Sequence, residues 1–320
     1  TEGKSFYTDA TNASRTSLYN IHDNKWDNEL LEIFKIPLNI LPEVKDNIFE
    51  FGITSKNIIE KTIPINAMIG DQQSAAIGQN CFNPGDIKAT FGTGCFILVN
   101  TGKKPLKSKN KLLSTIAYKI NNITSYALEG SIFVSGSTMK WLRDELGIIK
   151  NINDSQSLAA SIKDNNGVYF VPAFTGLGAP HWKPDARGTI VGLTGSSGKA
   201  EIVRAALEAV AYQSVDLFDA MKADGQKTKR VRVDGAMSAN DWLLQFLSSI
   251  SNVRIEKSDN AETTSKGAAI LASIGSGLYA SIEETKVFWQ LHKSFIPNME
   301  DEVIKKYRNG WNKAIKRTIL

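Results

Sequence analysis

Short apolar runs alternate with amphipathic stretches along most of this chain, from Ile63 onward. Apolar residues that recur every three or four positions predict helices, and short apolar runs between turn residues predict strands. The clearest helix is expected over residues 200–221, because its apolar residues fall on one face: Val203, Leu207, Val210, Leu217 and Met221. Further helices are expected over 72–79, 240–250, 266–274 and, in a lysine-rich tail, 301–319.

Strands are expected over 64–69, 87–91, 96–100, 168–174, 231–233 and 253–255. The turn Gly92-Thr93-Gly94 joins two of them and predicts a hairpin. Elsewhere strands and helices alternate, which predicts an α/β fold. A length of 320 residues favours about two domains. A boundary is expected between Gln79 and Lys88, at a break formed by Asn80, Asn83, Pro84 and Gly85.

The composition is that of a folded protein, with 42% hydrophobic and 22% charged residues. The net charge of +5 is small, and the lysines gather only between residues 103 and 111. A nucleic-acid site would interleave such charges with aromatic residues, which this run lacks. We therefore interpret it as a solvated loop and expect no nucleic-acid partner.

The two cysteines, Cys81 and Cys95, each lie inside an apolar stretch without metal-ligand spacing. Free buried thiols fit a reduced, cytoplasmic compartment. The three histidines are far apart and none stands near a conspicuous serine, so hydrolase chemistry finds no support. No run approaches the ~20 apolar residues of a membrane helix, and no signal peptide opens the chain. Because residue 1 is Thr rather than Met, we expect the start to be a cut.

Asp71 stands where an apolar run ends and a helix is expected to begin. In α/β folds, functional side chains project into a crevice at this point. A carboxylate there can accept a proton from an alcohol, but a purely structural aspartate would cap the helix at the same position. The residue pattern alone leaves both roles open.

Two glycine-containing turns are candidates for phosphate contacts. The glycines of Gly92-Thr93-Gly94 let a phosphate approach the backbone, and Thr93 offers both its N–H and its hydroxyl, although an ordinary hairpin needs the same residues. Asp234-Gly235, after the strand 231–233, suits either backbone contacts to a nucleotide or a plain loop. Neither a Walker nor a Rossmann motif is present, so the phosphate site must be of another kind.

Several segments, taken in chain order, resemble the glycerol kinases of the FGGY family of carbohydrate kinases. They are TDATNASRT (8–16), GDQQ (70–73), FGTGCF (91–96), YALEG (126–130) and GLGAPHW (176–182). Residues 188–208 are similar to the second signature of the family. The resemblance runs from Thr8 to Trp311, and the whole set is specific because other sugar kinases share the fold without it.

The resemblance implies two ribonuclease-H-like domains of the hexokinase–actin–heat-shock superfamily, with ATP in the cleft between them. Residues 1–80 would be the C-terminal part of the substrate domain, 88–277 the nucleotide domain, and 278–320 a C-terminal helical extension. The implied reaction is the phosphorylation of glycerol to sn-glycerol 3-phosphate by ATP with Mg²⁺. A homo-oligomer, dimer or tetramer, is also implied.

The resemblance also assigns roles to single residues. Asp71 would be the general base, Asp71 and Gln72 would hydrogen-bond glycerol, and Phe96 would pack on its carbon skeleton. The residues that would contact the nucleotide are Thr93, Gly136, Lys140, Ala236 and Asn240. Phosphoryl transfer depends mainly on alignment and charge neutralisation, so a set of this kind suffices together with Mg²⁺.

The sequence departs from the family pattern at several points. Lys140 stands where many glycerol kinases have Gln, and Ala236 where they often have Gly. Residues 55–62 do not match the loop that binds fructose 1,6-bisphosphate in some members. The family's Asp-x-Gly-Thr phosphate loop, its Mg²⁺-associated carboxylates and its Arg-Glu and Tyr glycerol contacts would lie upstream of Thr8. We therefore expect little activity from this chain by itself.

Three hypotheses follow: a glycerol kinase or the bulk of one, an FGGY kinase for another polyol or ketose, and a nucleotide-binding module without catalysis. The GDQQ and GTGCF runs favour the first hypothesis over the second. A pure binding module has no need of a carboxylate base at Asp71, which speaks against the third.

Overall fold

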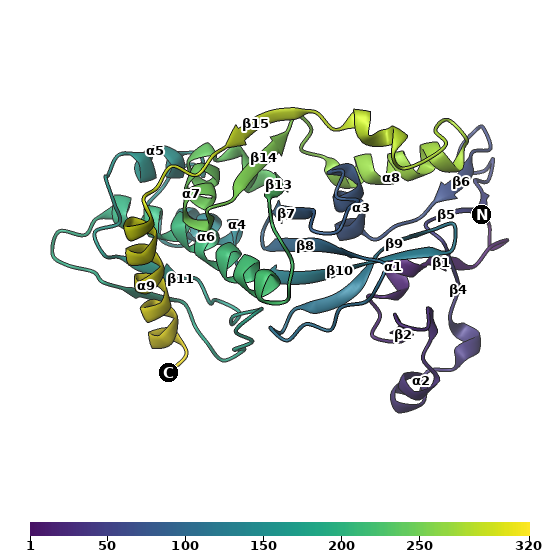
Figure 1. Cartoon of the computed structure of the whole chain (residues 1–320), viewed down its shortest axis with the longest axis horizontal. Helices are drawn as coiled ribbons and strands as arrows, with labels where there is room; N and C mark the ends of the chain where they lie inside the picture. Colours follow the sequence, from purple (N-terminus) through teal and green to yellow (C-terminus); the bar gives the residue numbers. More distant parts are fainter.

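A seven-stranded mixed sheet forms the centre of the computed structural model, which describes all residues from 1 to 320. The strand order is β15-β14-β13-β7-β8-β10-β9, and β13 runs parallel to β7 and β14 whereas the other neighbours are antiparallel (Figure 1). The strands are β7 (Ile87–Phe91), β8 (Cys95–Gly102), β9 (Leu113–Ile120), β10 (Ile123–Ile132), β13 (Arg230–Asp234), β14 (Arg254–Ser258) and β15 (Leu291–Phe295).

The helices are α1 (Ala10–Ala13), α2 (Asn28–Phe34), α3 (Asp71–Gly78), α4 (Gly136–Asp144), α5 (Asp154–Ala160), α6 (Lys199–Ala223), α7 (Asp241–Ser251), α8 (Thr263–Gly275) and α9 (Asp301–Thr318). Short 3₁₀ helices lie at η1 (Leu38–Ile40), η2 (Ala236–Ala239) and η3 (Glu284–Phe288). None of the helices is both long and apolar enough to cross a membrane. Small two-stranded sheets are formed by β1 (Tyr7–Asp9) with β4 (Glu43–Lys45), β2 (Tyr19–Asn20) with β3 (Lys25–Trp26), β5 (Ile48–Ile53) with β6 (Pro64–Ala67), and β11 (Tyr169–Val171) with β12 (Thr189–Val191).

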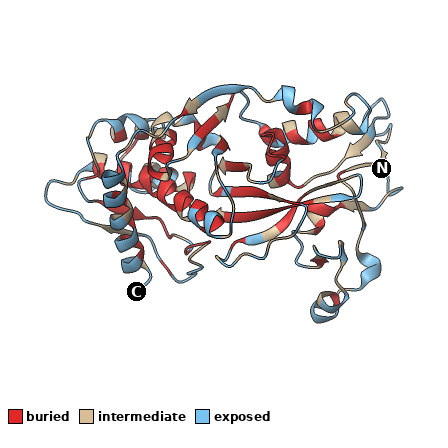
Figure 2. Cartoon of the chain, viewed as in Figure 1, coloured by how far each residue is buried: buried red, intermediate tan, exposed pale blue.

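The two faces of the central sheet bury different partners. Successive side chains of a strand point to opposite faces, and Ile97 of β8 joins the large core that contains α6, whereas its neighbour Leu98 packs with Ala76 of α3. Figure 2 shows α6 and the central strands as the most buried part of the molecule. The apolar stripe expected for residues 200–221 is buried, which confirms this helix and explains its length.

The structure contains the expected hairpin of β7 and β8 and the expected helices, with ends that differ by a few residues. These helices are α3, α6, α7, α8 and α9. The lysine run between residues 103 and 111 is an exposed loop, and both cysteines are free and buried, as expected. The strands β9, β10 and β15 were not expected. The tail 278–320 therefore also contributes a sheet strand, because β15 pairs with the outer edge of β14.

Helix α9 packs into the core through four buried residues, of which Trp311 is the largest. Trp311 is fully buried, and its ring stacks on that of Tyr212 in α6 with the ring centres 5.2 Å apart. Its Nε1 donates a hydrogen bond of 2.8 Å to Asp216. The tail is thereby packed into the same core as the central sheet.

Helices α3 and α8 cross in backbone contact. A Cβ added to Gly267 of α8 would lie 2.7 Å from the carbonyl carbon of Ser74 in α3, and one added to Gly78 would lie 2.9 Å from that of Thr263. Such distances exclude any side chain at these two glycines. The crossing fixes the separation of α8 from α3, whose first residue is Asp71.

Candidate active site

The Gly92-Thr93-Gly94 turn is bonded to the start of α4. The Thr93 carbonyl accepts hydrogen bonds from the backbone N–H groups of Ser135 at 2.9 Å and Ser137 at 3.1 Å, and Gly136 N–H donates to the Gly92 carbonyl at 3.0 Å. A Cβ at Gly136 would lie 2.6 Å from that carbonyl oxygen, so only glycine allows this approach. The structure thus brings together Thr93, which is exposed, and Gly136.

A second glycine brings the end of β13 to the same turn. Gly235 has a φ of +84°, and a Cβ there would lie 2.5 Å from the carbonyl oxygen of Phe91. Residue 236 therefore follows directly from the strand end beside the hairpin. Asp234 itself is buried and accepts hydrogen bonds from Gln79 Nε2 at 3.0 Å and from the Thr263 hydroxyl, so its carboxylate has a structural role.

A cavity of about 260 Å³ lies beside this turn. Ala236 and Asn240 both line it, together with Ile152, Asn153, Ser155, Gln156, Met237 and Ala239. Asn240 caps α7 by accepting a hydrogen bond of 2.9 Å from Leu243 N–H, which fixes its side chain in the cavity wall. Met237 connects the cavity to the turn, because a Cβ on Gly136 would lie 3.2 Å from its side chain. Larger hollows of about 450 to 590 Å³ elsewhere are lined by none of the expected site residues.

Lys140 lies on α4, one turn beyond Gly136, and does not line the cavity. Its side chain is exposed and makes no hydrogen bond or ion pair. The neighbouring Trp141 points into the core, where its ring packs against Phe170 and Phe174. The Lys140 ammonium is therefore free either to reach a bound phosphate or to stay in solvent.

We expect Lys140→Gln to weaken ADP binding about two- to fivefold at low salt, because an exposed charge contact contributes less than about 1 kcal/mol. The loss should shrink as salt is raised, since the contact is screened. Calorimetric titration of ADP at low and at high ionic strength measures both values. Equal affinities of the two proteins at both salts would show that Lys140 does not contact the nucleotide.

The expected acceptor residues gather at the N-terminus of α3. Asp71 is exposed, and its Oδ1 accepts a hydrogen bond of 2.6 Å from Gln72 N–H. The Gln72 side chain reaches the sheet, where its Oε1 accepts a hydrogen bond from Nζ of Lys88 in β7. Phe96 is 36% exposed and lies opposite Thr90 in the β7–β8 register. A carboxylate, an amide and an open aromatic face therefore share one small area next to the turn.

Lys88 and Thr90 are site residues that the sequence reasoning missed. Lys88 is fully buried, and its Nζ also donates a hydrogen bond of 3.0 Å to the Thr90 hydroxyl. Burial lowers the pKa of the Lys88 ammonium, although the nearby carboxylates of Asp234 and Glu129 oppose that effect. The available signal was a lysine inside an apolar strand, directly before the glycine turn.

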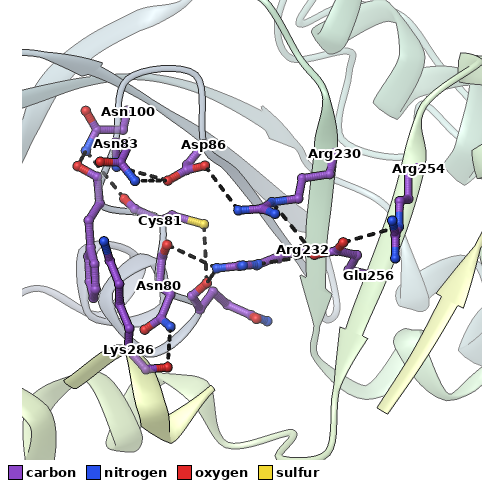
Figure 3. Close-up of polar contacts among 12 residues, drawn as sticks. Asn80, Cys81, Asn83, Asp86, Asn100, Arg230, Arg232, Arg254, Glu256 and Lys286 are labelled. Atoms are coloured by element: carbon purple, nitrogen blue, oxygen red, sulfur yellow. Dashed lines mark hydrogen bonds and ion pairs between the residues drawn. The ribbon is translucent and has the colours of Figure 1, made fainter. Parts of the chain in front are cut away.

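The polar side chains continue across the same face of the sheet. Lys88 pairs in register with Arg232 of β13, which in turn pairs with Glu256 of β14. In Figure 3, the Glu256 carboxylate lies among three arginines, with the closest contacts at 3.4 Å to Arg232 and 3.2 Å to Arg254. Arg232 also donates to the backbone carbonyls of Gln79 and Asn80 at 2.5 and 3.0 Å. These contacts tie the segment after α3 to the sheet.

Two family domains match the chain. Residues 87–276 match the C-terminal domain of the FGGY family of carbohydrate kinases, and residues 1–78 match its N-terminal domain. The glycerol kinase of Coxiella burnetii is 52% identical over the whole chain, and that of Gluconobacter oxydans is 51% identical. The chain spans 64% and 62% of the lengths of these two relatives.

Solved structures of sugar kinases are also similar to this chain. The crystal structure of Plasmodium falciparum glycerol kinase with ADP has a TM-score of 0.92 and 41% sequence identity, over 98% of this chain and 63% of that one. A ligand-bound xylulose kinase from Lactobacillus acidophilus has a TM-score of 0.84 at 23% identity, which reflects a shared fold. The expected α/β architecture, the two-domain fold of sugar kinases, is confirmed.

Proposed function

Because the chain belongs to the FGGY family of carbohydrate kinases, we propose that it carries the acceptor base and the nucleotide site of an ATP-dependent glycerol kinase. The observation that carries the proposal is the link from the Gln72 side chain, next to Asp71, through Lys88 to Thr90, two residues before the Gly92-Thr93-Gly94 turn. The chain is 51–52% identical in sequence to two glycerol kinases along its entire length, which supports glycerol as the acceptor.

Asp71 is the proposed general base. As a hydroxyl of glycerol attacks the γ-phosphorus of ATP, its proton passes to the Asp71 carboxylate, the new oxygen–phosphorus bond forms, and the bond to the ADP oxygen breaks. The products are sn-glycerol 3-phosphate and ADP. Asp71 is suited to this role because its carboxylate is exposed at a helix start, with one oxygen oriented by Gln72 N–H. Gln72 binds the acceptor, and Phe96 covers its carbon atoms.

The glycine turn and α4 form the proposed phosphate contacts. Thr93 presents an exposed hydroxyl, and the N-terminus of α4 lies beside it, where a helix favours negative charge. Thr93 and Gly136 would lie next to the phosphates, with Lys140 one turn further along α4. Ala236 and Asn240 would line the rest of the ADP site in the 260 Å³ cavity.

Magnesium is expected to accompany the nucleotide, since it neutralises charge on the transferred phosphate. The chain contains no group of three or more His, Cys, Asp or Glu side chains arranged to hold a metal ion. An ion held mainly by the nucleotide phosphates and by water needs no such group. Asp71 is the carboxylate we place at the reacting atoms.

We propose the same division of the chain that the sequence indicates. Residues 1–80 contribute the acceptor base, residues 88–277 the nucleotide site, and residues 278–320 extend the second unit by β15 and α9. The matched family ranges, 1–78 and 87–276, support these boundaries.

A second candidate is a chain that binds nucleotide without turning over glycerol by itself. The observation that favours it is the shared length, since the chain spans 64% of the Coxiella burnetii enzyme. Both candidates keep the same nucleotide site, and they differ in whether the 320 residues are sufficient for phosphoryl transfer.

We expect ADP to bind the 320-residue chain weakly, with binding that a calorimetric titration detects at millimolar ADP. Glycerol phosphorylation is then followed by ADP release in two proteins: the chain itself, and a hybrid in which it replaces the matching residues of the Coxiella burnetii glycerol kinase. Turnover in the hybrid supports the proposed function. A hybrid that folds and binds ADP but phosphorylates no glycerol contradicts it, and a test of other polyols and of ketoses such as xylulose then identifies the acceptor.

A further inference from the structure

Lys88 is a buried cation that the proposed reaction does not use. It lies in the middle strand of the sheet, is 0% exposed, and points to the face covered by α3. An uncompensated buried ammonium is costly, so its partners carry information about its purpose. Those partners are the Gln72 side-chain oxygen and the Thr90 hydroxyl, and both belong to the proposed acceptor area.

The contact fixes which way the Gln72 amide faces. An ammonium group only donates hydrogen bonds, so it binds the oxygen of an amide and not the NH₂ group. The Gln72 oxygen must therefore face Lys88, and the NH₂ group is turned away from it. No protein group accepts a hydrogen bond from that NH₂ group, and the Gln72 side chain is partly exposed. The amide thus offers a donor toward the open side of the site.

The neighbouring residue supplies the opposite kind of group. Asp71 is exposed, and an ionised carboxylate only accepts hydrogen bonds. One acceptor beside one donor complements two hydroxyls of a polyol, of which one donates and the other accepts. If the Gln72 amide were reversed, the site would present two acceptors side by side and would favour a cation instead.

We propose that Lys88 is a positioning residue that locks the side-chain amide of Gln72, so that the acceptor site presents an acceptor at Asp71 beside a donor at Gln72. This inference rests on the proposed function and deepens it, because it assigns the recognised chemical class: a neutral compound with neighbouring hydroxyl groups. Thr90 assists by accepting a second hydrogen bond from the ammonium, which restricts its movement.

Arg232 provides a matched control. It is also a buried cation on the same sheet face and pairs in register with Lys88 on the adjacent strand. Its contacts are the carbonyls of Gln79 and Asn80 and the Glu256 carboxylate, and none of them is in the proposed site. We therefore expect Arg232→Met to lower the stability of the protein and to leave the KM for glycerol unchanged.

The test compares Lys88→Met, Arg232→Met, Gln72→Ala and the double variant Lys88→Met/Gln72→Ala in the hybrid kinase. We expect Lys88→Met to raise the KM for glycerol about 2- to 12-fold, the size of the lost hydrogen bond between the Gln72 amide and a hydroxyl, with the KM for ATP unchanged. The double variant should be little worse than Gln72→Ala, because Lys88 acts through Gln72. Unchanged KM for glycerol in Lys88→Met, or fully additive effects in the double variant, would overturn the proposal.

A second measurement separates this proposal from the proposed function. In the 320-residue chain, the side-chain ¹⁵N–¹H signals of Gln72 are identified by their loss in Gln72→Ala. We expect Lys88→Met to shift these signals and Arg232→Met to leave them in place. If the hybrid turns over no glycerol, the proposed function fails. The amide signals of Gln72 still test the positioning role of Lys88, and signals that do not move in Lys88→Met rule that role out.

Discussion

Replacing Asp71 by Asn is expected to lower kcat for glycerol phosphorylation about 10²- to 10⁴-fold, with ADP affinity nearly unchanged. The amide keeps the shape of the carboxylate and its hydrogen bond from Gln72 N–H but cannot take up the proton, and removal of a general base has an effect of this size. Steady-state kinetics of the hybrid kinase give kcat, and calorimetry gives the affinity for ADP.

Asp301→Asn is the matched control for this experiment. Asp301 is likewise an exposed aspartate at the first position of a helix, α9, and takes no part in the proposed site. The same chemical change there should leave kcat unaltered. Near-normal turnover of Asp71→Asn would show that another group accepts the proton, and Asp71 would then be left as a residue of the helix start.

The second large effect is expected for stability. Trp311→Ala should lower the free energy of unfolding by about 3–5 kcal/mol, because it removes a fully buried ring and leaves a cavity against Tyr212. The substitution also leaves the Asp216 carboxylate without the indole N–H. Urea denaturation of the 320-residue chain, followed by circular dichroism, measures the change.

Trp311→Phe separates the two contributions in that measurement. It keeps a six-membered ring against Tyr212 but removes the N–H donor and the pyrrole part of the indole, which should cost about 1–3 kcal/mol. Similar losses for the Ala and Phe variants would mean that the remaining ring contact with Tyr212 contributes little to the attachment of α9. A loss below 1 kcal/mol for Trp311→Ala would contradict the view that this side chain holds the tail in the core.

The sequence predicted those elements whose burial is one-sided or complete. The α6 stripe was readable because Val203, Leu207 and Val210 recur at helical spacing and face one core. Strand β10 was hidden because it mixes Glu129 with apolar residues, and this carboxylate is buried only through a 2.8 Å ion pair with Arg15, more than a hundred residues away. Pairing of that kind is a tertiary property and leaves no local pattern.

The candidate site shows the same limit. The residue pattern indicated Asp71 and the glycine turn with Thr93 as candidates, and the resemblance added Asn240. The contact between Lys88 and Gln72 could not be read from the chain, since it joins a strand to the preceding helix through their side chains. A lysine in an apolar strand indicates some buried partner, but only the packing of α3 on the sheet identifies which one.

The backbone contact between α3 and α8 restricts how the acceptor range of such an enzyme could be changed. Neither Gly78 nor Gly267 admits a side chain, so the separation of the two helices cannot be adjusted by residue size. Asp71 therefore cannot be moved back to make room for a bulkier alcohol. Space has to come from Phe96, which is partly exposed near the start of β8. Libraries for directed evolution should randomise Phe96 and leave the two glycines untouched.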